Sequence, residues 1–144
     1  MDSPISERPP RMEPAEVTRL LVQHGIAPTQ QRLEIASVLL GRRQHLSADE
    51  LLALVNGEGP VVSKATVYNT LNLFARNGLV REVIVDPSRV LYDSNTSPHH
   101  HFYNQSTGEL MDIEDRHIAV GSVPDLPEGT VMDGVEVIVR LRNE

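Results

Sequence analysis

The sequence predicts an α+β fold in two parts, a winged-helix part followed by a small α/β part. Three observations carry this prediction. The first half holds four apolar segments with helical spacing, a hairpin pattern follows at residues 79–93, and the last third alternates short strand patterns with polar turns and prolines. A length of 144 residues suits one domain or two small ones, which argues against an enzyme with a large catalytic core.

Four helices are expected, over residues 15–24, 30–40, 48–56 and 64–76. A serine or threonine precedes each of the last three. Such a residue indicates a helix start, because its side-chain oxygen accepts hydrogen bonds from the free N–H groups of the first turn. A glycine follows the end of each helix and supplies the left-handed conformation that stops it. In chain order these signals are Gly25, Thr29, Gly41, the capping box of Ser47 with Glu50, Gly57, Ser63 and Gly78.

Strand patterns fill the rest of the chain. Residues 79–85 and 89–93 flank the turn at residues 86–88 and predict a wing. A second hairpin is expected at residues 101–104 and 109–113, a short helix at most over residues 115–120, and a closing strand at residues 135–141. This tail of about 45 residues is marginal as an independent core, so we expect a second copy to complete it at the closing strand.

The net charge of −7 is unevenly distributed. Residues 1–97 hold ten Lys or Arg and eleven Asp or Glu, a balance of −1, whereas residues 98–144 hold three and nine, a balance of −6. The first part can therefore face an anionic partner, and the second part cannot. Neither an apolar run of membrane-spanning length nor a signal-peptide pattern occurs, so we expect a cytoplasmic protein.

Histidines and carboxylates gather in and beside the second hairpin. His99 and His101 share one face of an extended segment, and Asp112 lies on the partner arm, close enough to oppose them. Asp93 precedes this pair, and His45 stands just before the third helix. These three imidazoles and two carboxylates form a nitrogen and oxygen donor set suited to Fe(II), Mn(II) or Zn(II). A metal there draws on both parts of the chain and fixes the angle between them.

Other residues leave alternatives open. His100 points the other way, so it is either a second metal or haem site or a solvent-exposed ring, and His117 is similar. The chain has no cysteine, which excludes thiolate metal sites and disulfides. A metal-dependent hydrolase or a metal buffer is the alternative from another class, but no H-E-x-x-H helix, phosphate loop or G-x-S-x-G motif occurs. We therefore expect no enzyme.

The fourth helix presents polar side chains away from its apolar stripe, in types that suit the major groove of DNA. Amides can bond adenine edges, Thr and Tyr can meet thymine methyls or phosphates, and Lys can meet a phosphate. A solvated helix face has the same appearance, and the hairpin that follows favours DNA binding. The candidate contacts are Lys64, Thr66, Tyr68 and Asn69 on this helix, Arg32 on the second helix, and Arg81 and Arg89 on the wing.

Several stretches together resemble the ferric uptake regulator family and occur in its order. They are Ala27-Pro-Thr-Gln-Gln-Arg32, His45-Leu-Ser-Ala-Asp-Glu50, Ser63-Lys-Ala-Thr-Val-Tyr-Asn-Thr-Leu71 and the pattern from Asp93 to Asp112. The ending is similar to the iron response regulator branch. The resemblance implies a homodimeric, metal-responsive transcription factor that binds inverted repeats in promoters and controls iron or haem homeostasis genes. It maps the regulatory metal onto the same five residues and the base contacts onto Tyr68 and Asn69.

The chain departs from the family's pattern in places that bear on function. The two Cys-x-x-Cys pairs of the structural zinc site and the Cys-Pro motif of haem response are absent, and Ala27 replaces a basic residue that enters the minor groove. Asp112, in place of Glu, resembles the peroxide-sensing members, in which bound ferrous iron leads to oxidation of a ligand histidine. Peroxide or haem response, the physiological metal, repression or activation, and dimer or tetramer all stay open. The expected organisation is an arm at residues 1–14, a winged-helix DNA-binding domain at 15–94, a hinge at 95–98 and a dimerisation and metal-binding domain at 99–144.

Overall fold

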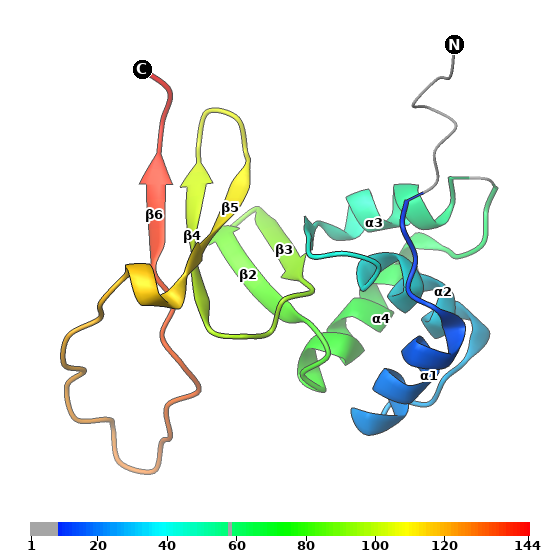
Figure 1. Cartoon of the computed structure of the whole chain (residues 1–144), viewed down its shortest axis with the longest axis horizontal. Coiled ribbons are helices and arrows are strands. Elements are labelled where there is room, and N and C mark those ends of the chain that lie inside the picture. The colour runs from blue at the N-terminus through cyan, green and yellow to red at the C-terminus, as the bar shows by residue number, and fades with distance from the viewer. Residues whose placement is uncertain (1–8, 58) are drawn as a thin grey trace. The chain divides into compact units, whose positions relative to one another are not determined.

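The computed structural model describes residues 9–57 and 59–144, and the chain divides into two compact units, Met1–Thr96 and Ser97–Glu144 (Figure 1). The first unit combines helices with a small sheet, and the second is built on another sheet. The α+β prediction is therefore confirmed. The division falls inside the stretch expected to be a hinge, whose mobility stays a prediction.

Unit 1 begins with the four expected helices. Their capping signals form the predicted bonds: Thr29 Oγ1 accepts from Arg32 N at 3.3 Å, and Ser63 Oγ accepts from Thr66 N at 3.1 Å. Ser47 and Glu50 bond each other's backbone N–H at 3.0 and 3.1 Å, which completes the capping box. The helices are α1 (Pro14–Gln23), α2 (Gln30–Leu39), α3 (Ala48–Val55) and α4 (Lys64–Arg76).

The wing is a three-stranded antiparallel sheet in the order β1-β3-β2, with β1 at His45–Leu46, β2 at Arg81–Asp86 and β3 at Arg89–Asp93. The sequence did not predict β1, because two residues carry no periodicity. In the register, His45 and Arg81 lie opposite Asp93 on its two sides. The wing therefore holds His45 beside Asp93 by backbone pairing.

Among the described residues, eighteen buried hydrophobic residues form one core, and every one of them belongs to unit 1. Leu21, Leu71 and Phe74 are fully buried at its centre. The chain before α1 is fixed to this core: Met12 packs against it and donates its N–H to Ser37 O at 2.9 Å. A Cβ on Gly41 would overlap the carbonyl of Pro10. Residues 10–12 therefore contact unit 1, and residues 1–8 lie outside the described part. The mobility expected of residues 1–14 stays a prediction.

Unit 2 is a three-stranded sheet in the order β5-β4-β6. The hairpin of β4 (His99–Asn104) and β5 (Leu110–Glu114) is confirmed, although β4 begins two residues earlier than expected. The closing strand β6 (Ile138–Leu141) runs parallel to β4 and is shorter than predicted. The expected helix is one 3-10 turn, Asp115–His117, because the chain then leaves the sheet as a long loop.

The interior of unit 2 is unusual. Its buried residues within the described chain are His99, His100, His101, Tyr103 and Ile113. Three of these five are histidines, so this sheet is held by polar contacts more than by hydrophobic burial. None of the helices in the described part of the chain is long and apolar enough to cross a membrane.

Candidate metal centre and DNA-binding surface

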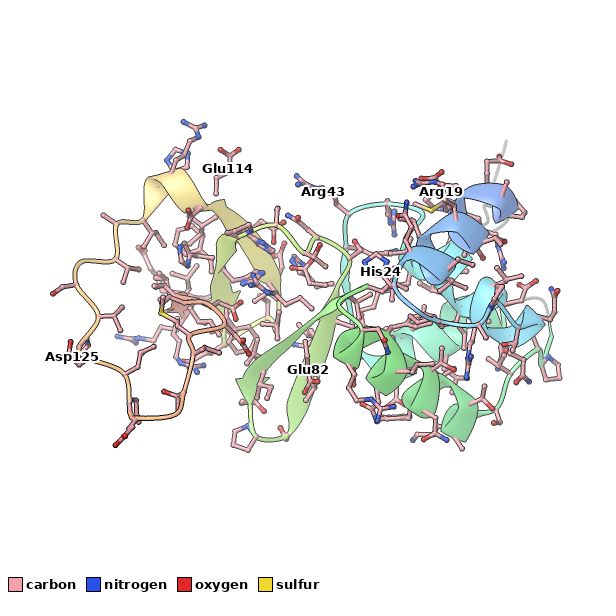
Figure 2. The ribbon with its side chains drawn as sticks, turned by 90° about the horizontal axis from the view of Figure 1, so that it is seen from below. Arg19, His24, Arg43, Glu82, Glu114 and Asp125 are labelled. Carbon is pink, nitrogen blue, oxygen red and sulfur yellow. The ribbon has the colours of Figure 1, made fainter. Side chains whose placement is uncertain are left out.

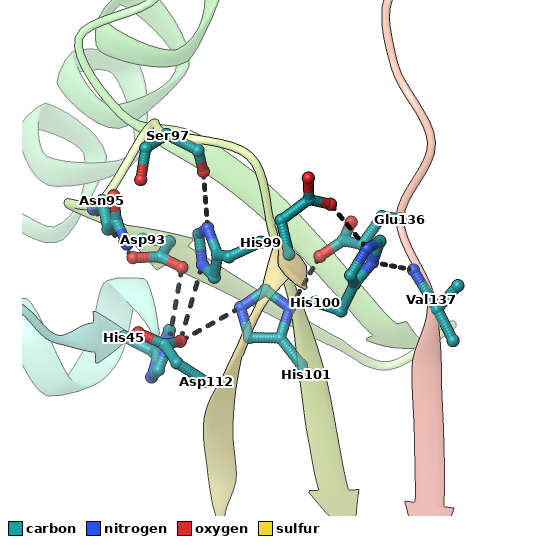
Figure 3. A network of polar contacts seen from close by, with 11 residues as sticks. His45, Asp93, Asn95, Ser97, His99, His100, His101, Asp112, Glu136 and Val137 are labelled. Carbon is teal, nitrogen blue, oxygen red and sulfur yellow. Dashed lines mark hydrogen bonds and ion pairs between the residues drawn. The ribbon is translucent and has the colours of Figure 1, made fainter. Parts of the chain in front are cut away.

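Three expected metal ligands meet on one face of the unit 2 sheet. The alternation of β4 directs His99 and His101 to the same side, with ring centroids 4.6 Å apart. Asp112 lies opposite His101 in the β4–β5 register, and its Oδ1 is 3.5 Å from His99 Nε2 and 3.4 Å from His101 Nε2 (Figure 3). The donor atoms of the three side chains lie within 4.8 Å of one another.

The outer nitrogens of both rings lie close to oxygen atoms. His99 Nδ1 is 2.6 Å from the carbonyl of Ser97, and His101 Nδ1 is 2.8 Å from a carboxylate oxygen of Glu136. The Nε2 atoms of the two rings and the carboxylate of Asp112 thus converge on one point. Imidazole nitrogens and carboxylate oxygens are ligands that first-row metal ions accept, so the donor set fits a metal ion.

A second donor pair lies in unit 1. His45 Nε2 is 3.3 Å from Asp93 Oδ2, and the pairing of β1 with β3 sets this contact. Asp93 is only 1% exposed, and its other oxygen accepts from Asn95 N at 2.8 Å. A buried carboxylate requires such partners, because desolvation of the charge is costly. The structure thus assembles the five expected ligands as a triad in one unit and a pair in the other.

His100 is buried, which corrects the expectation that its ring could lie in solvent. Its Nδ1 accepts from Val137 N at 2.9 Å, and its Nε2 is 3.0 Å from Asp115 Oδ1. Both nitrogens are therefore engaged, and a metal or haem iron would have to displace one of these contacts. His117 is exposed on the 3-10 turn, and among the described residues it joins no group of three metal donors.

The exposed face of α4 carries the expected DNA contacts. Lys64 is exposed, with Nζ 3.5 Å from Asp49 Oδ1 and 5.8 Å from the ring centre of Tyr68. Tyr68 is 39% exposed, and Asn69 is exposed beside it. Thr66 is partly covered, because its hydroxyl accepts from Ser63 Oγ at 2.9 Å in the cap. The helix thus offers cationic, aromatic and amide groups to a ligand.

A groove of about 960 Å³ follows the C-terminal half of α4 and reaches the start of β2. Asn69, Asn72 and Arg76 line it from the helix, and Arg81 and Glu82 line it from the strand. Asn72 is one of the polar side chains expected to face away from the apolar stripe of α4, whereas Arg76 was not among the expected DNA contacts. The four-residue spacing from Asn72 to Arg76 is the signal that could have found Arg76.

The three predicted arginine contacts lie at different places on unit 1. Arg81 stands at the base of the wing, at the end away from the turn, whereas Arg89 begins β3 beside the turn. Arg32 is on α2, and its Nη1 donates to the carbonyl of Ala27 at 3.1 Å. Burial raises the pKa of Tyr92, and the charge of Glu82 raises it further, so this phenol stays neutral.

Sequence reasoning missed the groups that orient the ligands. Glu136 and Ser97 hold the two ligand histidines, and Asn95 holds Asp93. Two of these contacts come from backbone atoms, whose placement no side-chain pattern reports. Glu136 precedes a strand whose parallel register with β4 is fixed only by the folded chain.

A winged-helix unit followed by a small sheet with a histidine and aspartate donor set defines a recognisable class of protein. The ferric uptake regulator family model matches residues 23–123. The Peroxide-responsive repressor PerR of Staphylococcus aureus is 34% identical over 94 residues, which cover 65% of this chain and 64% of that protein. The Peroxide operon regulator of Bacillus subtilis is 33% identical over 98 residues, 68% of each chain. The chain belongs to the ferric uptake regulator family.

Solved structures share the fold. The ferric uptake regulator from Pseudomonas aeruginosa, solved with manganese, has a TM-score of 0.69 at 22% identity and covers 89% of this chain and 98% of its own. The regulator from Vibrio cholerae has a TM-score of 0.67 at 20% identity and covers 88% and 98%. The sequence match itself spans slightly less than two thirds of the length of the Staphylococcus relative.

Proposed function

We propose that this chain is a homodimeric, metal-responsive transcriptional regulator that binds promoter DNA through α4. The observation that carries the proposal is the convergence of His99, His101 and Asp112, whose nitrogen and oxygen atoms form a donor set of the kind that binds first-row metal ions. The names of the relatives, which are repressors and uptake regulators, support the same conclusion. The DNA contacts of the proposal are those predicted from the sequence, with Tyr68 and Asn69 at the bases.

We propose further that the pair His45 and Asp93 joins the triad of unit 2 to hold one ion. Two donors are too few for a first-row metal, and three leave positions open. Asp93 and His99 are separated by five residues, so the chain itself keeps the two sets within about 20 Å of each other. Fe(II) is the proposed ion in the cell, and Mn(II) or Zn(II) suits the same donors.

When bound, the metal supplies positive charge that balances the two aspartates and ties unit 1 to unit 2. The two α4 helices of a dimer must meet two half-sites at once, so a small change in their spacing costs contacts on both sides. Linkage requires that DNA tighten the metal by the same factor by which the metal tightens DNA.

Titration of labelled promoter fragments with and without metal tests the proposal. The His99→Ala chain is expected to lose the metal dependence of DNA binding, whereas His117→Ala, an exposed histidine outside the donor set, is expected to keep it. Unchanged affinity and metal dependence in His99→Ala would contradict the mechanism. A metal buffer or hydrolase predicts metal uptake or turnover without any sequence-specific shift.

A peroxide sensor is the second candidate, favoured by the two peroxide-responsive relatives and by Asp112. Peroxide should then oxidise His99 or His101 in the iron-loaded chain and release DNA. Mass spectrometry should find one added oxygen on that peptide with iron but not with manganese. The same peptide left unmodified while DNA binding persists would exclude this candidate.

The remaining finer predictions belong to this proposal. The protein acts in the cytoplasm, where promoter DNA is found, and has no catalytic role. Membership of the iron response branch, with control of iron or haem homeostasis genes, is expected from the ending of the chain. Haem response through His100 would require the contact with Val137 or Asp115 to break, and haem titration of His100→Ala tests it.

A further inference from the structure

Residues 118–137 form a loop that carries exposed aliphatic side chains. From here on this loop is called the arm, and it is distinct from the N-terminal arm expected at residues 1–14. The arm has no helix or strand and runs from the 3-10 turn to β6, with Asp125 on its outer part (Figure 2). Val131 is 86% exposed and Met132 is 54% exposed. Val120, Val123, Leu126 and Val135 are also exposed. So much apolar surface on a unit with so small a hydrophobic interior indicates a missing partner.

The arm is already shaped for binding. Pro124 and Pro127 fix the backbone φ angle at two positions. The carbonyl of Pro127 accepts from Thr130 N at 3.2 Å, and Gly129 within this turn has φ +80°, which favours glycine. A segment with a preformed shape loses little conformational entropy when it docks.

Both ends of the arm are fastened to one side chain. His100 accepts from Val137 N at the far end of the arm and contacts Asp115 just before its start. The ring lies on the β4 face opposite His99 and His101. His100 therefore holds the arm to the strand that carries two metal ligands.

A hollow of about 540 Å³ lies on the same unit. Phe102 lies opposite Val139 in the register of β4 and β6, and Ile113 lies opposite His100 on the same face. With Ile118 they form the apolar lining of the hollow. Phe102 and Ile113 alternate with His99, His101 and Asp112 along their strands, so their side chains lie on the opposite face of the sheet, although Asp112 also borders the hollow. The hollow has room for several aliphatic side chains.

We propose that the arm of each copy packs Val131 and Met132 into this hollow on the second copy. The inference rests on the homodimer of the proposed function and adds the surfaces that form it. One chain carries both complementary parts, an exposed aliphatic segment and an apolar hollow. A twofold pair therefore buries both at once in a closed arrangement. It also supplies the hydrophobic interior that unit 2 lacks by itself.

The charges around these parts give the association a distinctive salt dependence. Asp112 and Glu114 border the hollow, and the arm carries Asp125, Glu128 and Asp133. These like charges repel across the proposed contact, and salt screens the repulsion. Dimer affinity should therefore rise with ionic strength, whereas DNA affinity should fall because DNA binding releases counterions.

Cross-linking tests the contact directly, because the chain has no cysteine of its own. Full-length Val131→Cys is mixed with differently tagged Val139→Cys, subunits are exchanged, and the mixture is oxidised. We expect a disulfide between the two tagged chains. Val131→Cys mixed with Val61→Cys, an exposed position on unit 1, is the control and should give none. If the 131–139 mixture cross-links no better than this control, the proposed contact is wrong.

Sedimentation of the full chain gives a second measurement. The Val131→Asp, Met132→Asp double variant should weaken the dimer by about 100-fold or more, as loss of a central apolar contact does. Val22→Asp, at a position 60% exposed on α1, should not. A dimer unchanged in the double variant overturns the arm proposal alone. A monomeric unmodified chain overturns the homodimer of the proposed function as well.

Discussion

The two units differ in what fills their interiors. Unit 1 buries eighteen clustered hydrophobic side chains beneath its helices, whereas the buried residues described in unit 2 are three histidines with Tyr103 and Ile113. Hydrophobic burial is non-directional and stabilises unit 1 whatever is bound to the protein. Polar contacts among buried histidines depend on each partner being present. We therefore expect unit 1 to be stable with or without a ligand, and the structural order of unit 2 to increase when a ligand binds.

The largest effect should come from the core of unit 1. Phe74→Ala removes a fully buried ring and is expected to lower the free energy of unfolding by about 3–5 kcal/mol. Denaturant unfolding of the full chain measures this loss. Val22→Ala, at an exposed position of α1, should change it by less than about 0.5 kcal/mol. A small loss for Phe74→Ala would break the comparison, because unit 1 would not depend on its core.

Metal should stabilise the strands that carry its proposed ligands more than it stabilises the helices of unit 1. An ion at 100 times its dissociation constant adds about 2.7 kcal/mol to the state that binds it. Hydrogen exchange of the full chain with and without Mn(II) should therefore slow in β4 and β5, with little change in α1 and α2. His101→Ala should abolish the added protection. Equal protection of both units, or none, would show that the donor set does not order unit 2.

The orienting carboxylate should have a smaller effect. Glu136→Gln removes the charge beside His101 Nδ1 and is expected to weaken metal binding by about 10- to 100-fold. DNA affinity at saturating metal should be unchanged, since Glu136 acts through the histidine. Metal titration of Glu136→Gln beside Glu109→Gln, an exposed carboxylate on the same unit, checks both statements. Equal metal affinities in the two variants would exclude the orienting role.

The smallest effect should come from the cap of α4. Ser63→Ala removes the acceptor of Thr66 N and is expected to cost about 1 kcal/mol of stability. Ser122→Ala on the exposed arm is the matched control and should cost nothing measurable. Thermal unfolding of the two variants gives the difference. A loss of the same size in both would show that the capping bond contributes nothing.

Local signals predicted unit 1 well because its helices obey local chemistry. Thr29, Ser47 and Ser63 lie three residues before the N–H groups that they cap, so the last three helices could be placed without any long-range contact. The two-residue β1 could not be placed, because its pairing with β3 joins residues far apart in the chain.

The candidate metal site was predictable in its residues but not in its support. The period of two along β4 put His99 and His101 on one face, and the hairpin brought Asp112 opposite them. Glu136 and the backbone of Val137 reach β4 only through the parallel pairing of β6, after a loop of some twenty residues. Such a register depends on tertiary packing and leaves no pattern in the sequence.

His99, His100 and His101 are consecutive in β4 but have different roles. The rings of His99 and His101 lie beside the carboxylate of Asp112, where a cation can bind. The ring of His100 contacts Val137 and Asp115 at the two ends of the loop on the other side of the strand. A register shift of β4 by one residue would exchange these roles, because every side chain would move to the other face of the sheet. The position of each histidine along β4 therefore decides which role its side chain has. The backbone hydrogen bonds between β4 and β5 keep this register.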